Sequence, residues 1–284
     1  MGVKSIGVIG AGTMGNGIAQ VFAATGYAVT MVDVSQAALD RGLQAIGSSL
    51  DRLVKKESIN ETDKAETLGR IATSTELAGL SDSDFIIEAA TENPDVKFSI
   101  LREVDAVARE GAVIASNTSS ISLTRLAAQT GRPEKVIGMH FMNPVPVMQL
   151  VEIIRARQTD DATCALTEEL TLALGKTPVM ANDSPGFVSN RILCPMINEA
   201  IFTVYEGIAE PEAVDEIMKL GMNHPIGPLA LGDLIGLDVV LSVMEVLHQG
   251  FGDSKYRPCP LLIQMVDANQ LGRKTGKGFY DYNQ

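Results

Sequence analysis

Short apolar runs alternate with helical patterns through the first half of the chain. These runs lie at residues 5–9, 28–32, 85–90, 112–116, 136–141 and 147–154. Each has the length of a β-strand and is largely apolar, as is typical of strands buried inside a sheet. Strands that alternate with helices pair in parallel and carry helices on both faces of the sheet. The pattern therefore predicts a doubly wound α/β sheet.

Helical periodicity between the second and third runs is longer than a simple crossover needs. It covers about 36–57 and 61–70, which predicts a helical hairpin that projects from the sheet. A second change comes after about Asp183, where the chain becomes almost entirely helical. Ser184 and Pro185 are typical of an N-cap and a first helical residue.

The expected helices of this second part cover about 187–206, 211–220, 228–249 and 260–271. The sequence thus predicts two domains, residues 1–183 with the sheet and residues 184–284 as an all-α domain. The stretch around 229–247 is strongly apolar, but it contains three carboxylates, which are too costly inside a bilayer. It predicts a buried core helix rather than a membrane span.

Composition narrows the class of protein further. Hydrophobic residues make up 45% of the 284 positions and the net charge is −12, which argues against disorder and against a nucleic-acid or membrane-surface partner. The three cysteines are far apart, and no His or Cys pair has the spacing of metal ligands. We therefore expect no disulfide framework and no metal. No signal or lipidation pattern is evident, so we expect a soluble, cytoplasmic protein.

A glycine motif follows the first predicted strand and precedes a helix. Gly10, Gly12 and Gly15 fit G-x-G-x-x-G, with Thr13 and Met14 between the last two glycines. In this motif the first glycine allows a tight turn, the second lets the backbone approach a pyrophosphate, and the third allows close helix–strand packing. The helix N-terminus offers N–H groups to the phosphates. These features predict a Rossmann-type dinucleotide site.

The end of the second strand indicates which dinucleotide is bound. Asp33 stands 23 positions after Gly10, where a carboxylate binds the ribose hydroxyls of the adenosine. A carboxylate repels a 2′-phosphate, and residues 34 and 35 supply no arginine to receive one. We therefore predict NAD rather than NADP.

One histidine is a candidate catalytic base. His140 lies at the end of an apolar strand, and open α/β sheets bind ligands at strand ends. Oxidation of an alcohol by a nicotinamide cofactor needs a group that takes the hydroxyl proton, and imidazole suits both directions near neutral pH. The alternative is a buried histidine that is satisfied by a backbone carbonyl.

Seven sequence blocks identify a resemblance that runs from residue 5 to residue 282. They are residues 10–15, 88–93, 116–120, 140–148, 183–191, 225–228 and 272–280. Together they resemble the short-chain L-3-hydroxyacyl-CoA dehydrogenase family, in particular its bacterial 3-hydroxybutyryl-CoA dehydrogenases. The resemblance implies NAD-dependent oxidation of (S)-3-hydroxybutyryl-CoA to acetoacetyl-CoA and the reverse reduction. Alternatives are a related 3-hydroxy acid dehydrogenase without a CoA substrate and a non-catalytic NAD-binding protein.

The resemblance also implies roles for the catalytic residues. His140 is the general acid/base and Glu152 the carboxylate that orients it, while Ser119 and Asn190 bind the substrate oxygens. Strand arithmetic does not predict the His140–Glu152 contact. A tight hairpin closed by residues 143–146 puts Gln149 opposite His140 and leaves Glu152 about 10 Å away at roughly 3.3 Å per residue. For Ser119, the alternative is the N-cap of a helix that begins near Ser120.

Further residues are expected to bind NAD or CoA, and one helix is expected to contact a partner subunit. The resemblance implies NAD contacts from Glu92, Lys97, Ser119, Asn143 and Lys274. Arg52, Lys55 and Lys56 share one face of the projecting helix, where they would either bind the CoA phosphates or form a solvated surface. The expected helix at 228–249 is apolar nearly all round, so we expect a homodimer through the C-terminal domain.

Overall fold

The chain forms two compact units. The computed structural model describes residues 2–283, and these divide between Asp183 and Ser184 into an N-terminal and a C-terminal unit. No helix among residues 2–283 is both long and apolar enough to span a lipid bilayer.

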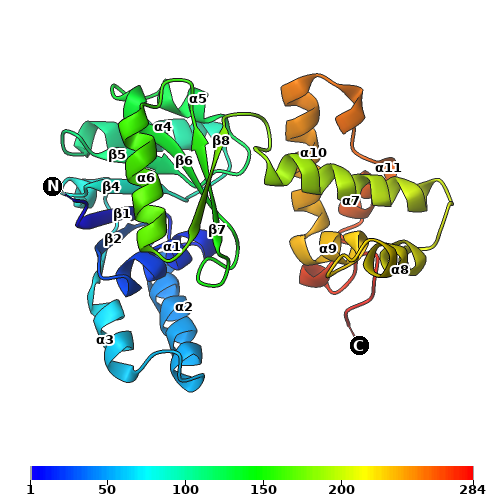
Figure 1. Cartoon of the computed structure of the whole chain (residues 1–284), viewed down its shortest axis with the longest axis horizontal. Coiled ribbons are helices and arrows are strands. Elements are labelled where there is room, and N and C mark those ends of the chain that lie inside the picture. The colour runs from blue at the N-terminus through cyan, green and yellow to red at the C-terminus, as the bar shows by residue number, and fades with distance from the viewer. Residues whose placement is uncertain (1, 284) are drawn as a thin grey trace. The chain divides into compact units, whose positions relative to one another are not determined.

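The N-terminal unit contains one eight-stranded sheet (Figure 1). Its strands are β1 (Ser5–Ile9), β2 (Ala28–Val32), β3 (Ile71–Ser74), β4 (Phe85–Glu88), β5 (Val113–Ser116), β6 (Val136–Phe141), β7 (Leu150–Arg155) and β8 (Thr177–Asn182). Their order is β3-β2-β1-β4-β5-β6-β7-β8, and every neighbouring pair is parallel except β6 and β7. The predicted doubly wound sheet is confirmed, with the strand order reversing direction between β1 and β4.

Two strands were not predicted, and both lie at the edges of the sheet. β3 has only four residues, and all six residues of β8 are exposed or half-buried. Edge strands are short and solvated on at least one side, so they lack the continuous apolar run that marks a central strand.

Six helices connect the strands. They are α1 (Thr13–Ala24), α2 (Gln36–Lys55), α3 (Glu61–Gly69), α4 (Pro94–Val107), α5 (Leu123–Ala127) and α6 (Asp161–Ala173). Side chains cap several N-termini: Ser35 caps α2, Asn93 caps α4, and Asn60 forms a capping box with Asp63 at α3. The predicted helical hairpin is α2 with α3; the two pack on each other and on α1, and extend away from the sheet (Figure 1).

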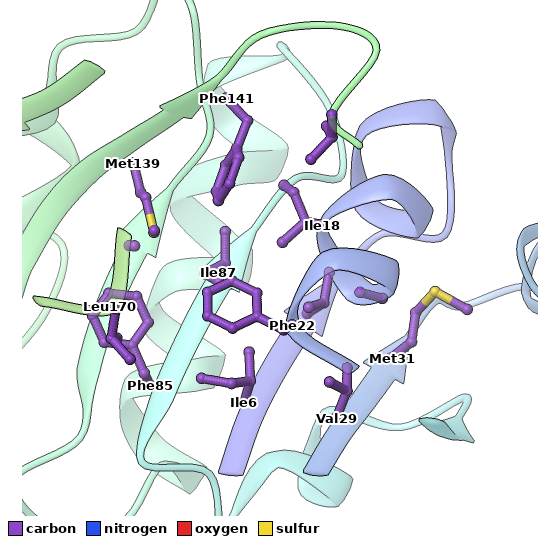
Figure 2. Close-up of a cluster of buried hydrophobic side chains, with 14 of the residues drawn as sticks. Ile6, Ile18, Phe22, Val29, Met31, Phe85, Ile87, Met139, Phe141 and Leu170 are labelled. Carbon is purple, nitrogen blue, oxygen red and sulfur yellow. The ribbon is translucent and has the colours of Figure 1, made fainter. Parts of the chain in front are cut away.

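The main core lies on one face of the sheet. Alternate residues of the central strands meet apolar residues of α1, α2 and α6 there. Figure 2 shows the strand residues together with Ile18 and Phe22 of α1 and Leu170 of α6. Phe22 of α1, Phe85 of β4 and Phe141 of β6 are almost fully buried in this cluster. Because successive side chains of a strand point to opposite faces, His140 lies on the other face from Met139 and Phe141.

The C-terminal unit is all-α. Its helices are α7 (Ser189–Tyr205), α8 (Pro211–Gly221), α9 (Pro228–Ile235), α10 (Leu237–Phe251) and α11 (Pro260–Asp267). The prediction that Ser184 and Pro185 begin the first helix is wrong. Gly186 and Phe187 have positive φ values of 71° and 49°, so the chain turns there and α7 starts at Ser189.

The prediction of a single helix at 228–249 is also wrong, because Gly236 divides this stretch into α9 and α10. Gly236 has φ 103° and ψ 124°, a conformation that side-chain-bearing residues rarely adopt. The break releases the N–H of Leu237 from the helical pattern, and it donates instead to the carbonyl of Leu271 at 3.1 Å. Hydropathy alone could not locate this break, because the residues on both sides are apolar.

Replacing Gly236 tests whether the break is built into the fold. Gly236→Ala should lower the free energy of unfolding by about 1–3 kcal/mol, because alanine is strained at this φ. Gly47→Ala in α2 is the matched control. A Cβ there meets no atom within 4 Å, and alanine should stabilise the helix by about 0.5–1 kcal/mol. Denaturant unfolding measures both; equal effects would contradict the assignment.

Candidate active site

The glycine loop closes the carboxyl end of β1 against the start of α1. Gly10 has φ 97°, and a Cβ on it would lie 2.6 Å from the carbonyl oxygen of Ala89. A Cβ on Gly15 would lie 1.8 Å from the carbonyl oxygen of Gly10. Packing within the protein therefore excludes side chains at both positions.

Gly12 differs, because the protein itself does not require a glycine there. A Cβ on Gly12 would have no atom within 4 Å, and its φ of −67° suits any residue. It is the N-cap of α1 and provides no side-chain cap, so the first N–H groups of the helix face this open space. A bare backbone beside these donors fits a pyrophosphate that approaches closely.

Asp33 stands beside the glycine loop at the end of β2. Its carboxylate accepts hydrogen bonds from the N–H of Ala11 at 2.9 Å and from the N–H of Ser35 at 3.0 Å. A carboxylate has about four acceptor positions. The two backbone bonds thus orient Asp33 and leave it able to accept from the hydroxyls of a ribose.

A cavity of about 280 Å³ lies at the carboxyl ends of β1, β4 and β5. Its lining residues are Gly12, Thr13, Met14, Ala89, Ala90, Thr91, Glu92, Lys97 and Asn117. Five of the residues predicted to bind NAD are therefore brought together here. The lining fits a dinucleotide, because it combines helix N-terminal amides, a glycine without a packing role and polar groups at strand ends.

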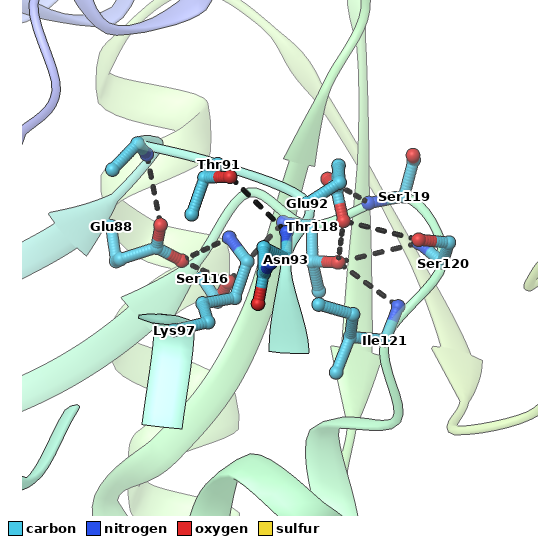
Figure 3. Close-up of polar contacts among 11 residues, drawn as sticks. Glu88, Thr91, Glu92, Asn93, Lys97, Ser116, Thr118, Ser119, Ser120 and Ile121 are labelled. Carbon is cyan, nitrogen blue, oxygen red and sulfur yellow. Dashed lines mark hydrogen bonds and ion pairs between the residues drawn. The ribbon is translucent and has the colours of Figure 1, made fainter. Parts of the chain in front are cut away.

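Glu92 organises the loop that contains Ser119. Its carboxylate accepts from the hydroxyl of Thr118 at 2.7 Å and from the backbone N–H of Ser119 at 3.0 Å (Figure 3). The hydroxyl of Ser120 donates to it at 3.1 Å. The alternative interpretation of Ser119 as a helix N-cap is wrong, because Ser122 caps α5.

Lys97 lines the cavity from α4 but is buried and paired. Its ammonium forms an ion pair with Glu88 at the end of β4, and both side chains are almost inaccessible to solvent (Figure 3). Glu88 also accepts from the hydroxyl of Ser116 at 2.7 Å and from the N–H of Ala90 at 2.8 Å. No role for Glu88 is predicted from the sequence, although a carboxylate that ends an apolar strand is a signal that could have marked it.

His140 and Glu152 face each other across β6 and β7. The antiparallel register pairs them directly, and Nδ1 of His140 lies 2.8 Å from Oε2 of Glu152. Both side chains are buried. The tight hairpin that would put Gln149 opposite His140 does not form. The connection covers residues 142–149 and is long enough to bring Glu152 into register.

A buried lysine holds this wide connection. Nζ of Lys176 donates to the carbonyl of Val145 at 2.6 Å and to that of Met148 at 2.7 Å. Val145 is buried against Gly17 of α1, where a Cβ would lie 2.9 Å from the valine Cβ. Burial lowers the pKa of Lys176 below its ordinary value. The connection, which also contains Asn143, is thus fixed to the helix that follows the glycine loop.

Asn117 connects the two neighbouring strand ends. Its Oδ1 accepts from the backbone N–H of Phe141 at 2.9 Å, next to His140. The loop with Ser119 and the strand with His140 are therefore held together by a side chain that the sequence analysis did not assign. A polar residue directly after a buried strand is the signal that could have found it.

Two of the remaining predicted residues belong to the C-terminal unit, and three lie at the end of α2. Asn190 is the second residue of α7, and Lys274 forms an ion pair with Asp238 within the C-terminal unit. Arg52 and Lys55 lie in the last turn of α2, with Lys56 as its C-cap; all three are exposed. Among residues 2–283, no three His, Cys, Asp or Glu side chains are grouped to hold a metal ion.

Gly12 and Gly15 give a direct test of which glycine serves a ligand. Gly12→Ala should leave thermal stability unchanged, because the added Cβ meets open space, but should weaken NAD binding by at least about tenfold, or 1.4 kcal/mol. Gly15→Ala is the matched packing variant and should lower stability. Calorimetric titration with NAD and thermal unfolding measure the two effects; unaltered NAD affinity in Gly12→Ala would contradict the assignment.

Comparison with known proteins identifies the family to which this chain belongs. Residues 5–184 match the model of the 3-hydroxyacyl-CoA dehydrogenase NAD binding domain, and residues 186–282 match that of the 3-hydroxyacyl-CoA dehydrogenase C-terminal domain. A 3-hydroxybutyryl-CoA dehydrogenase of Bradyrhizobium diazoefficiens is 54% identical, over 99% of this chain and 96% of its own. The crystal structure of (S)-3-hydroxybutyryl-CoA dehydrogenase from Ralstonia eutropha is 58% identical and has a TM-score of 0.97, with 99% of this chain and 100% of that chain covered. The chain therefore belongs to the 3-hydroxyacyl-CoA dehydrogenase family, and its N-terminal unit is the family's NAD-binding domain.

Proposed function

We propose that this protein interconverts (S)-3-hydroxybutyryl-CoA and acetoacetyl-CoA with NAD, and that His140 is the general acid/base. The observation that carries the proposal is the buried contact between His140 and Glu152 at the carboxyl edge of the sheet, one strand beyond the dinucleotide cavity. The names of the similar proteins support the substrate.

Glu152 determines which nitrogen of His140 acts. An ionised carboxylate only accepts hydrogen bonds, so Nδ1 of His140 must donate to it. The lone pair then lies on Nε2, which takes the proton of the substrate's 3-hydroxyl and returns it in the reverse direction. Bound NAD would supply the acceptor for the hydride that leaves C3. Ser119 would hydrogen-bond the 3-oxygen, and Asn190 would polarise the substrate carbonyl.

The remaining residues bind the two ends of the cofactor. Gly12, Thr13 and Met14 would hold the pyrophosphate at the N-terminus of α1, and Asp33 the adenosine ribose. The cofactor contacts of Glu92, Lys97, Asn143 and Lys274 follow from the family resemblance. In this proposal, the helical C-terminal unit contributes substrate binding and the dimer contact.

Substitution of His140 tests the catalytic role. His140→Ala should lower kcat by about 10²–10⁴-fold, the usual contribution of general acid–base catalysis, while NADH affinity stays unchanged. Glu152→Gln should also lower kcat, because an amide no longer fixes the tautomer. His224→Ala, in the C-terminal unit, is the matched control and should keep full activity. A kcat of His140→Ala equal to that of the wild-type protein would refute the role.

A substrate series tests the CoA assignment. We expect NADH-dependent reduction of acetoacetyl-CoA and much slower reduction of free acetoacetate. Arg52→Ala with Lys56→Ala should raise KM for acetoacetyl-CoA by about three- to tenfold, since each exposed ion pair contributes about 1 kcal/mol or less. The KM for acetoacetyl-pantetheine, which lacks the nucleotide phosphates, should not change.

Arg41→Ala, at the other end of the same helix, is the control for the loss of positive charge. Equal rates with acetoacetate and acetoacetyl-CoA would instead favour a 3-hydroxy acid dehydrogenase without a CoA substrate. An unchanged KM for acetoacetyl-CoA at low salt would indicate that Arg52, Lys55 and Lys56 form a solvated surface and do not bind CoA.

We also propose a homodimer through the C-terminal unit, supported by its exposed apolar side chains. Ile217 and Leu220 of α8 are 60% and 79% exposed and lie on one helical face. Light scattering should give about twice the 30.2 kDa of one chain. Ile217→Asp with Leu220→Asp should yield monomers, whereas Gln249→Asp should not. Leu241 is unsuitable for this test because it packs against the unit's own core. A wild-type mass of one chain would contradict the dimer.

A further inference from the structure

A buried pair of opposite charges lies behind the dinucleotide cavity. Lys97 of α4 lines the cavity, whereas Glu88, its ion-pair partner, is not among the lining residues. Three donors converge on the Glu88 carboxylate: the Lys97 ammonium, the Ser116 hydroxyl and the Ala90 N–H. Burying a charged pair is costly and is weak evidence of a role in stability alone. Because Lys97 lines the cavity, we looked to the ligand of the cavity for the function of this pair.

The sheet order indicates which half of the cofactor meets Lys97. Asp33, the proposed ribose ligand, ends β2 on one side of β1, whereas β4 and β5 lie on the other side. A dinucleotide crosses the sheet at the point where the strand order reverses, so its two halves lie on opposite sides of that point. With the adenosine half at Asp33, the nicotinamide half extends over β4 and β5. Lys97, Glu92 and Asn117 line that side of the cavity.

The two redox forms of the cofactor differ in charge at this end. The oxidised nicotinamide ring carries a positive charge, and the reduced ring is neutral. An unbalanced ammonium at Lys97 would therefore repel NAD⁺ and leave NADH unaffected. Resting on the proposed NAD site, we infer that Glu88 sets the relative affinity for NAD⁺ and NADH by neutralising Lys97 from behind the cavity.

Glu92 does not replace Glu88 in this function. Its carboxylate accepts hydrogen bonds from hydroxyl and backbone groups of Thr118, Ser119 and Ser120, none of which is charged. Glu92 thus contributes one negative charge, and the three side chains together carry −1. Loss of the Glu88 charge brings this sum to zero, and this change weakens the binding of the oxidised cofactor alone.

The test measures dissociation constants of NAD⁺ and NADH for the wild-type protein and three variants. Glu88→Gln should weaken the binding of NAD⁺ by about tenfold relative to the binding of NADH. This is the size expected for one charge removed at roughly 10 Å with an effective dielectric constant of about 20. Lys97→Gln should shift the ratio the other way. Glu88→Gln with Lys97→Gln should restore the wild-type ratio, although both affinities can fall.

Ser116→Ala is the matched control. It removes a neutral hydrogen bond from the same carboxylate, so it should alter both affinities by one factor and leave their ratio unchanged. A purely structural role of Glu88 predicts the same for Glu88→Gln. A wild-type ratio in folded Glu88→Gln, or an equal shift in Ser116→Ala, would overturn the inference. If Glu88→Gln does not fold, an unshifted ratio in Lys97→Gln overturns it.

The measurement separates this inference from the proposed function. Both constants are obtained without turnover, by calorimetric or fluorescence titration. Absence of acetoacetyl-CoA reduction by a wild-type protein that binds both cofactors would refute the proposed substrate, and the ratio would still decide the role of Glu88.

Discussion

The site depends on the antiparallel register of β6 and β7. It pairs His140 with Glu152 directly, and a slip by one residue would turn one of the two side chains to the opposite face of the sheet. The connection at 142–149 allows this register, and Lys176 fixes that connection through the carbonyls of Val145 and Met148. Because a buried carboxylate is costly without a partner, pairing with His140 also favours this register over others.

One face of the sheet carries the apolar core, and the other face carries the buried polar side chains of the site. The residues of the main cluster, such as Phe85, Met139 and Phe141, meet α1, α2 and α6 on one face. The buried polar side chains Glu88, Ser116, His140 and Glu152 occupy alternate positions of the same strands and thus belong to the other face. Side chains and loops at the carboxyl ends of these strands then connect the two polar pairs, since Asn117 joins the loop after β5 to the end of β6. The apolar face can support the sheet without constraining the residues of the site.

The sequence was sufficient for the central part of the fold and for several residues that line the cavity at the carboxyl ends of β1, β4 and β5. Apolar runs identified six of the eight strands, and the glycine motif marked the residues between β1 and α1 that line the cavity. Features that depend on long-range geometry were not predictable. β8 was missed because an edge strand is half solvated, and the helix break at Gly236 was missed because apolar residues flank it. The length of the connection after β6 was misjudged because its stability comes from Lys176, nearly thirty positions away. Motifs therefore found the residues at strand ends, but not the side chains that hold them in place.

The central claim is that Glu152 fixes the tautomer of His140, with the proton on Nδ1 and the lone pair on Nε2. ¹⁵N NMR of labelled protein measures this directly, at a pH where the imidazole is neutral. The chain has only three histidines, so the His140 signals can be assigned by substitution. The account predicts a protonated, pyrrole-type Nδ1 and an unprotonated, pyridine-type Nε2 in the wild-type protein, with this preference reduced in Glu152→Gln. A proton on Nε2 and a bare Nδ1 in the wild-type protein would contradict it.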